Sequence, residues 1–131
     1  MPLSLASSIH HLAIICSDYE RSKHFYTNIL GLTIIRETYR STRDSYKLDL
    51  ALNGQYILEL FSFPSPPARV NRPEAVGLRH LAFAVTNLDE AIHQLNLHQI
   101  ATEPIRIDEL TQKRFTFFED PDRLPLELYE E

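Results

Sequence analysis

Short runs of alternating apolar and polar residues dominate this chain, and two helical stretches interrupt them. Alternation from Ile9 to Cys16, rich in β-branched residues, predicts a strand. Ser17-x-x-Glu20 then forms a capping-box pattern, which predicts a helix that continues to about Leu30 and stops at Gly31. Three further strands are expected at Thr33 to Tyr39, Tyr46 to Leu52 and Tyr56 to Phe61. The last two flank Asn53-Gly54, a strong hairpin signal.

The second half of the chain repeats this order of elements. Alternation predicts a strand from Leu78 to Val85, and Thr86-x-x-Asp89 caps a helix expected from Leu88 to His98. Three more strands are expected near Thr102 to Ile107, Arg114 to Glu119 and Leu124 to Tyr129, with Pro121-Asp122 in the last turn. Each half therefore predicts a β-α-β-β-β module.

Two sequence matches support the internal repeat. His11-Leu12-Ala13 recurs 69 residues later as His80-Leu81-Ala82, and Leu58-Glu59-Leu60-Phe61 recurs 68 residues later as Leu126-Glu127-Leu128-Tyr129. The matches predict an α+β fold of two tandem βαβββ modules within one domain, residues 1–131. Module 1 spans about residues 8–61 and module 2 about 78–131. The proline-rich segment 62–77 is expected to be a stiff linker.

Four polar residues occupy matching places in the repeat. Alternation puts His11, Glu59, His80 and Glu127 on the strand faces opposite the bulky aliphatic residues. A carboxylate on an apolar face is costly unless it is paired or bound to a metal, and imidazole with carboxylate suits a borderline divalent cation. The alternative is four unrelated polar residues at sheet edges. The repeated placement favours the metal-ligand hypothesis.

Composition excludes several classes of function. The chain has 131 residues, 13 Lys+Arg and 18 Asp+Glu, for a net charge of -5, which argues against nucleic-acid binding. Only 3 glycines are present, too few for a phosphate-binding loop. Cys16 is the single cysteine and is expected to be a small buried hydrophobe. No signal peptide or membrane span is visible, so we expect a cytoplasmic protein without membrane partners.

Two longer patterns resemble a known family. His11-x6-Asp18-x3-Ser22-x2-Phe25-Tyr26-x3-Leu30-Gly31-Leu32 resembles the first-module signature of the vicinal oxygen chelate superfamily, and Phe118-x-Asp120-Pro121-Asp122-x4-Glu127-Leu128 resembles its C-terminal signature. That superfamily includes glyoxalase I, bleomycin-resistance proteins, fosfomycin-modifying enzymes and extradiol dioxygenases. The resemblance implies that paired modules roll a curved mixed sheet into a cleft around a metal. It also implies that the chain forms a homodimer.

The resemblance assigns the ligand positions to His11, Glu59, His80 and Glu127. This ligand set is most similar to that of glyoxalase I, which implies Ni or Zn, with Co, Mn or Fe as alternatives. The implied activity is that of a lyase acting on a small substrate, the hemithioacetal of methylglyoxal and glutathione, through a metal-stabilised enediolate. Glu127 would be the catalytic carboxylate that moves the proton, with Glu59 as the second one.

The chain also departs from the glyoxalase I pattern. The position of an arginine that helps hold glutathione is Ile15 here, and the Pro-Asp-Gly turn is Pro121-Asp122-Arg123. Another thiol adduct, another enzyme of the superfamily (a dioxygenase or an antibiotic-modifying thiol transferase) and a drug-binding protein without catalysis therefore remain alternatives.

Some residues near the expected site have open roles. Alternation puts His10 on the face opposite His11. Lys47 and Asp49 share one strand face, where they either line the cleft or pair with each other. Lys113-Arg114 and the phenylalanines that follow either hold an anionic substrate or form a solvated hairpin.

Overall fold

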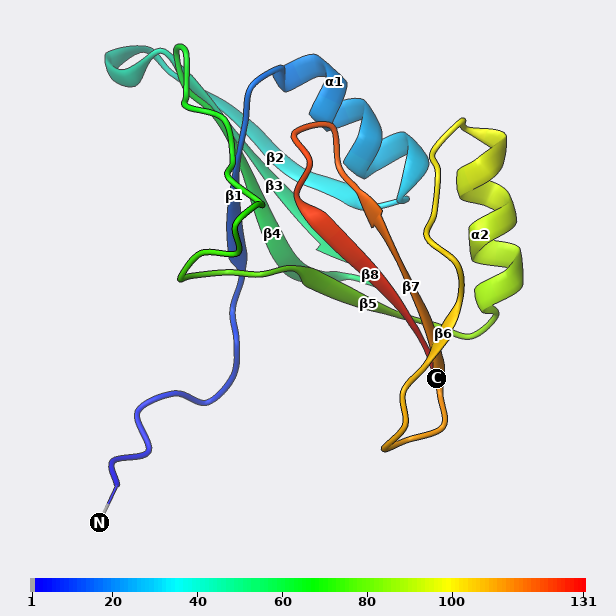
Figure 1. The fold of residues 1–131 in the computed structure, drawn as a ribbon. Coiled ribbons are helices and arrows are strands. Elements are labelled where there is room, and N and C mark those ends of the chain that lie inside the picture. The colour runs from blue at the N-terminus through cyan, green and yellow to red at the C-terminus, as the bar shows by residue number, and fades with distance from the viewer. Residues whose placement is uncertain (1) are drawn as a thin grey trace. The chain divides into compact units, whose positions relative to one another are not determined.

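The computed structural model describes residues 2–131, which form two compact units divided between Pro66 and Pro67. Each unit contains one four-stranded sheet and one main helical segment (Figure 1). The predicted α+β fold of two tandem βαβββ modules is therefore confirmed.

Module 1 follows the predicted order of elements. Its elements are β1 (Leu12–Cys16), α1 (Tyr19–His24), the π-helical turn η1 (Phe25–Ile29), β2 (Thr33–Arg40), the 3-10 turn η2 (Ser41–Arg43), β3 (Ser45–Leu52) and β4 (Gln55–Ser62). The strand order is β1-β4-β3-β2. β1 runs parallel to β4, and the other neighbours are antiparallel. The first and last strands of the module are thus adjacent, which brings distant parts of its sequence together.

Module 2 has the same topology. Its elements are β5 (Leu81–Val85), α2 (Leu88–Leu97), β6 (Arg106–Ile107), β7 (Arg114–Glu119) and β8 (Pro125–Glu130), in the sheet order β5-β8-β7-β6. The strand expected from Thr102 is much shorter than predicted. Pro104 has no N–H to donate, and the chain beside it contacts β7 through Glu103 instead, whose N–H donates to the Phe117 carbonyl.

The N-cap of each main helical segment lies one residue later than predicted, although α2 begins at Leu88 as expected. Asp18, not Ser17, accepts the Arg21 N–H at 3.2 Å. In module 2, Asn87 takes the place predicted for Thr86 and accepts the Glu90 N–H at 3.0 Å. All four residues are of types that cap helices well, so the backbone path decides between neighbours.

The first helix is also not α-helical to its end. It changes at Phe25 into η1, whose last bond joins the Leu30 N–H to the Phe25 carbonyl. Thr27 donates its hydroxyl to the Lys23 carbonyl at 2.7 Å. In an α-helix, the Lys23 carbonyl would accept the backbone N–H of Thr27, so the Thr27 hydroxyl competes for this acceptor.

Aliphatic side chains line one face of each sheet, as the alternation predicted. The fully buried residues include Leu48, Leu50, Leu58 and Leu60 on the sheet of module 1, Leu126 on the sheet of module 2 and Leu88 on α2. Cys16 is 1% exposed and donates to the Phe61 carbonyl, which confirms its structural role. No helix within residues 2–131 has the length and apolar character required to cross a bilayer. The opposite face of each sheet is left for polar chemistry, and it carries the predicted ligands.

Candidate functional site

In module 1, strand pairing brings His11 and Glu59 together. His11 lies directly before β1, and the parallel register of β1 on β4 sets Ala13 beside Glu59. His11 Nε2 lies 3.2 Å from Glu59 Oε1, although 48 positions separate the residues in the sequence. The Glu59 side chain is 12% exposed, so its carboxylate is largely removed from solvent.

Module 2 builds the same pair in the same way. His80 directly precedes β5, and the register of β5 on β8 sets Ala82 beside Glu127. His80 Nε2 lies 3.1 Å from Glu127 Oε1, and the Glu127 side chain is also 12% exposed. The two modules therefore repeat the arrangement of the pair as well as its residue types.

Each pair has the spacing of two ligands of one ion. Atoms that each lie about 2.1 Å from a metal are about 3–3.4 Å apart at bond angles of roughly 90–110°. The observed separations of 3.2 and 3.1 Å match this spacing, and the donor types suit a divalent cation. Among residues 2–131, no group of three or more His, Cys, Asp or Glu side chains is placed to hold a metal ion. The structure thus gives each module two of the four predicted ligands.

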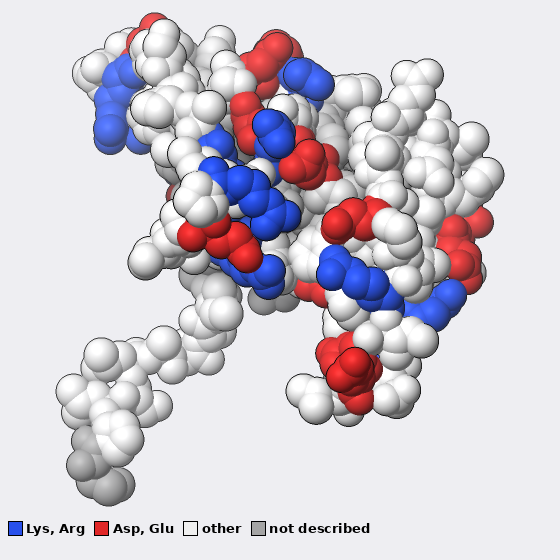
Figure 2. Space-filling model, viewed as in Figure 1, with Lys and Arg blue, Asp and Glu red and all other residues white. Residues whose placement is uncertain are grey.

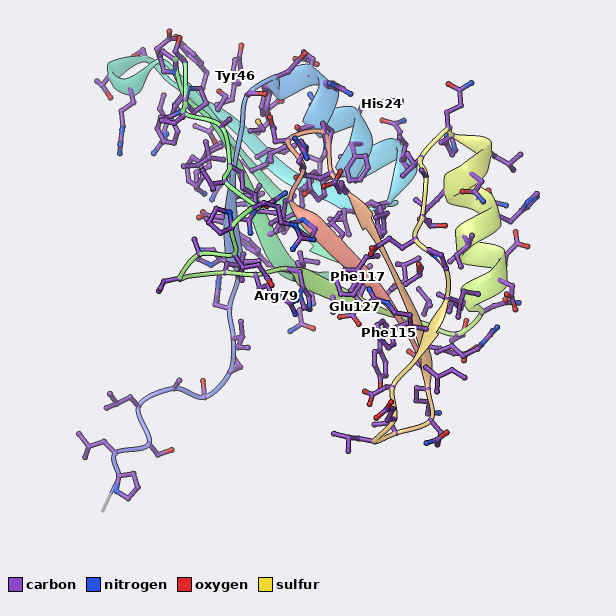
Figure 3. The ribbon with its side chains drawn as sticks, viewed as in Figure 1. His24, Tyr46, Arg79, Phe115, Phe117 and Glu127 are labelled. Atoms are coloured by element: carbon purple, nitrogen blue, oxygen red, sulfur yellow. The ribbon has the colours of Figure 1, made fainter. Side chains whose placement is uncertain are left out.

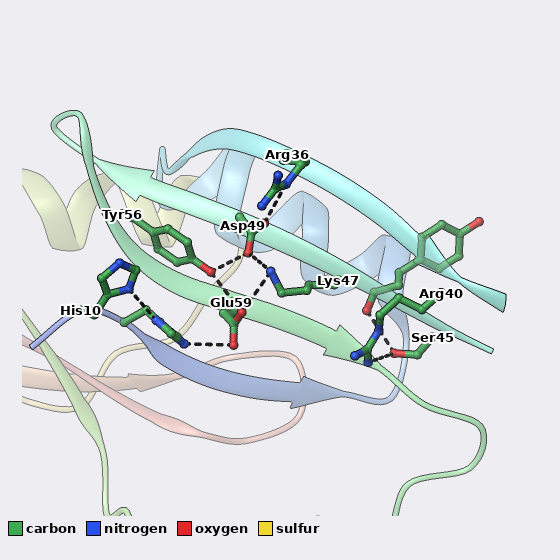
Figure 4. Close-up of polar contacts among 10 residues, drawn as sticks. His10, Arg36, Arg40, Ser45, Lys47, Asp49, Tyr56 and Glu59 are labelled. Carbon is green, nitrogen blue, oxygen red and sulfur yellow. Dashed lines mark hydrogen bonds and ion pairs between the residues drawn. The ribbon is translucent and has the colours of Figure 1, made fainter. Parts of the chain in front are cut away.

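A charged network surrounds Glu59 (Figure 4). Lys47 Nζ lies 2.7 Å from Asp49 Oδ1 and 3.2 Å from Glu59 Oε2. The Tyr56 hydroxyl donates to the same two carboxylates, at 2.5 and 3.1 Å. Arg36 Nε lies 3.5 Å from Asp49 Oδ2. Of the two roles left open for Lys47 and Asp49, the structure shows that they pair with each other.

The network fixes the charges of its members. The hydrogen bond to Asp49 raises the pKa of Lys47, and burial together with the bonds to Asp49 and Glu59 raises the pKa of Tyr56. Burial alone would raise the pKa of Asp49, but the bonds from Lys47 and Tyr56 outweigh it and hold that pKa below its usual value. At neutral pH, Asp49 is therefore an anion held by a lysine cation, and Tyr56 remains a protonated donor.

Aromatic rings take the equivalent places in module 2. Asp49 pairs with Glu59 across β3 and β4, and Phe117 pairs with Glu127 across β7 and β8. The place of Lys47 is taken by Phe115, and Figure 3 shows both phenylalanines beside Glu127. The Phe117 ring meets His80 edge-on at 5.0 Å.

The two glutamates therefore differ in how tightly they are held. Glu59 accepts contacts from His11, Lys47 and Tyr56. Glu127, among residues 2–131, has one such partner, His80. Its second carboxylate oxygen is left available.

The prediction for His10 was wrong. Its Nδ1 lies 2.8 Å from His11 Nδ1, and its ring lies 5.2 Å from that of Tyr56. The strand begins only at Leu12, so strict alternation does not apply to residues 10 and 11. Ile15, the position of the expected glutathione arginine, is 55% exposed and pairs with Phe61.

Three similarities place the chain among known proteins. The sequence profile of the Glyoxalase/Bleomycin resistance protein/Dioxygenase superfamily matches residues 8–128. An uncharacterised protein of Bacillus subtilis, YwkD, is 67% identical over 127 residues, which cover 97% of this chain and 99% of that protein. A crystal structure of a glyoxalase family protein from Enterococcus faecalis is 50% identical with a TM-score of 0.88, covering 95% of this chain and 98% of the other.

A more distant structure shares the fold. The trypanothione-dependent glyoxalase I of Leishmania major superposes with a TM-score of 0.72 at 22% identity, over 96% of this chain and 88% of the other.

Proposed function

Because the chain belongs to the Glyoxalase/Bleomycin resistance protein/Dioxygenase superfamily, we propose that it is a metal-dependent lyase or isomerase of the glyoxalase I type. Its substrate is a small molecule with oxygens on adjacent carbons, such as the hemithioacetal of methylglyoxal with a thiol. The observation that carries this proposal is the His–Glu pair, which recurs in both modules at 3.2 and 3.1 Å.

In this proposal, the two pairs together supply the ligands of one divalent ion. His11, Glu59, His80 and Glu127 hold Ni or Zn, with Co, Mn or Fe as the other candidates. When bound, such an ion supplies Lewis-acid polarisation of the substrate oxygens. We further propose that the chain is a cytoplasmic homodimer, with the pairs meeting within one chain or across the two subunits.

The contacts of the two glutamates suggest different roles. Lys47 and Tyr56 hold Glu59 in place, which suits a carboxylate that binds the metal ion in a fixed orientation. Glu127 has only His80 as a partner within residues 2–131, so its carboxylate has a free oxygen that can accept a proton. Glu127 is therefore the general base that takes the proton from one carbon and returns it to the next.

Metal content and turnover test this proposal on the same variants. Glu127→Gln is expected to lower kcat by about 10²–10⁴-fold, the usual contribution of a positioned base. His80→Ala and Glu59→Gln are expected to lower the bound metal per chain, measured by elemental analysis after loading with Ni or Zn. Glu109→Gln, at an exposed position in module 2, is the matched control and should change neither quantity.

Two results would contradict the proposal. If the His80 and Glu59 variants keep a full complement of metal, the ligand assignment fails. If no metal supports turnover of methylglyoxal with any thiol, the glyoxalase chemistry fails even when the ion is bound. Oxygen consumption with Fe and catechols, or thiol-dependent loss of antibiotic activity, would then identify another enzyme of the superfamily. A drug-binding protein would show neither metal nor turnover.

A further inference from the structure

One end of the ligand-bearing face of module 1 consists of two arginines stacked over two phenylalanines. The Arg40 guanidinium lies 4.7 Å from the Phe61 ring centroid and 5.8 Å from that of Phe63, and Arg43 lies 5.4 Å from the Phe63 ring. Phe61 follows Glu59 by two positions on β4, so both side chains are on the same face of the sheet. We call these four residues the arginine end.

The arginines of this end lack acidic partners. Within residues 2–131, neither Arg40 nor Arg43 has a carboxylate within 4.0 Å. Arg114, by contrast, is held by Asp89 and Glu130. Arg40 and Arg43 lie 5.8 and 5.4 Å from the Phe63 ring centroid, so two guanidinium groups without an acidic partner among the described residues occupy one place on this face. In Figure 2, Lys and Arg side chains cover part of the surface at the turn between β2 and β3.

Arg40 also has unused hydrogen-bonding capacity. One of its terminal NH₂ groups donates to Ser45 Oγ at 2.9 Å (Figure 4). Its Nε is buried and, within residues 2–131, has no hydrogen-bond partner. A buried N–H without an acceptor is unfavourable, so this guanidinium gains from an additional acceptor.

We propose that the arginine end binds the oxyanion of the substrate, a carboxylate or phosphate group, beside the His11–Glu59 pair. Arginine donors match planar oxyanions in pairs, and stacking on the rings holds the guanidinium plane in one orientation. Two positions along a strand span about 6.6 Å, so the bound anion would lie roughly that far from the reacting carbons near Glu59. Lys47, which pairs with Phe61 across β3 and β4, is already engaged by Asp49 and Glu59.

This assignment predicts a class of substrate. The position of the reacting carbons rests on the proposed function, whereas anion binding by the arginine end does not. A molecule that carries an acid group a few bonds away from its adjacent oxygens fits both requirements. A neutral molecule of the same size lacks the group that the arginines would hold.

Direct titration tests the anion site without any metal. Metal-free full-length protein, labelled with ¹⁵N, is titrated with inorganic phosphate in one arm and succinate in the other, with chloride keeping the ionic strength constant. We expect saturable shifts of the Arg40 Nε–Hε signal and of amides in η2 with at least one probe, and the stronger probe identifies the oxyanion. Arg40→Gln and Arg43→Gln should each weaken binding by about tenfold or more.

An arginine on α1 provides the matched control. Arg21 is exposed and, within residues 2–131, has no carboxylate within 4.0 Å, so Arg21→Gln makes the same charge change outside the arginine end. It should leave the affinity unchanged. The absence of saturable shifts with both probes, or equal binding by the Arg43→Gln variant, overturns the proposal. The exposed Arg43 keeps the test decisive if the Arg40 variant does not fold.

A second measurement separates this proposal from the proposed function. Metal content should be the same in Arg43→Gln and in the unchanged protein. If methylglyoxal is turned over, Arg43→Gln should raise KM for its adduct with the carboxylate thiol N-acetylcysteine and leave KM for the adduct with neutral 2-mercaptoethanol unchanged. Anion binding without metal binding would contradict the proposed function and leave the anion site standing. If Arg43→Gln changes KM equally for the adducts of both thiols, the anion site is contradicted and the proposed function stands.

Discussion

Replacing Lys47 by methionine tests whether the charged network beside Glu59 is held as the structure describes. Methionine keeps most of the length of the side chain and removes its charge. Asp49 is 1% exposed and would retain only the Tyr56 hydroxyl and the more distant Arg36, whose side chain is 71% exposed. The variant therefore leaves a buried carboxylate with little compensation.

The expected loss of stability follows from the burial of this pair. Removing one partner of a buried ion pair costs about 3–5 kcal/mol. The Lys47 side chain is 25% exposed, so solvent partly screens the pair, and we expect the lower end, about 3 kcal/mol. Unfolding entropy of about 2.1 cal/mol/K per residue converts this loss to a fall in Tm of roughly 10 °C for a chain of 131 residues.

Circular dichroism melts and urea unfolding measure this loss, and a second substitution tests its cause. Asp49→Asn in the Lys47→Met background removes the uncompensated charge and should restore at least half of the lost free energy of unfolding. Lys113→Met, at an exposed position on module 2, should change that free energy by less than about 0.5 kcal/mol. The reasoning is refuted if Lys47→Met costs no more than Lys113→Met, or if neutralising Asp49 gives no relief.

Two other predictions concern parts of the fold away from the ligand pairs. Lys23 and Tyr19 donate to Glu37 and hold its pKa below the usual glutamate value. The stability from these contacts is therefore complete above about pH 4.3 and is lost as the pH falls through the lowered pKa. Glu37→Gln should lower Tm at pH 7 and not at pH 2, and an equal difference at both pH values would contradict this. In module 2, Asp120 Oδ1 accepts the N–H groups of Asp122 and Leu124 at 2.8 and 2.9 Å. Asp120→Ala should cost about 3 kcal/mol in urea unfolding while the metal bound per folded chain stays constant, and a loss of metal would contradict a purely structural role.

The sequence predicted the sheets well because their signal is local. A strand with one buried face needs apolar residues at every second position, and Leu48, Leu50, Leu58 and Leu60 satisfy that rule. Helix starts were less certain, since Ser17 and Asp18 both suit a cap and only the backbone decides between them. The strand near Pro104 is short because few backbone groups there find hydrogen-bond partners. Alternation of side chains does not predict this pairing.

The polar face was predictable only in part, for a similar reason. The repeat identified His11, Glu59, His80 and Glu127 as one set, and the strand register brings them together as two His–Glu pairs. Tyr56 was missed because a register shift between Leu50 and Ala51 changes where it points. Arg40 was missed because the ring it contacts, Phe61, lies two strands away on β4, and alternation along one strand does not report that contact.

The two modules give their glutamates different surroundings on the same scaffold. Both carboxylates are equally exposed and equally distant from a histidine, so the backbone does not distinguish them. The cross-strand neighbour does: Asp49 brings a lysine and a tyrosine to Glu59, whereas Phe117 presents an apolar ring beside Glu127. The Phe117 ring offers no N–H or O–H to Glu127, so this carboxylate has fewer hydrogen-bond donors beside it than Glu59 has. The roles proposed for Glu59 and Glu127 thus follow from single side chains on the adjacent strands. If these roles are correct, exchanging Phe117 for a hydrogen-bond donor should lower kcat while the metal bound per chain, measured by elemental analysis, stays constant.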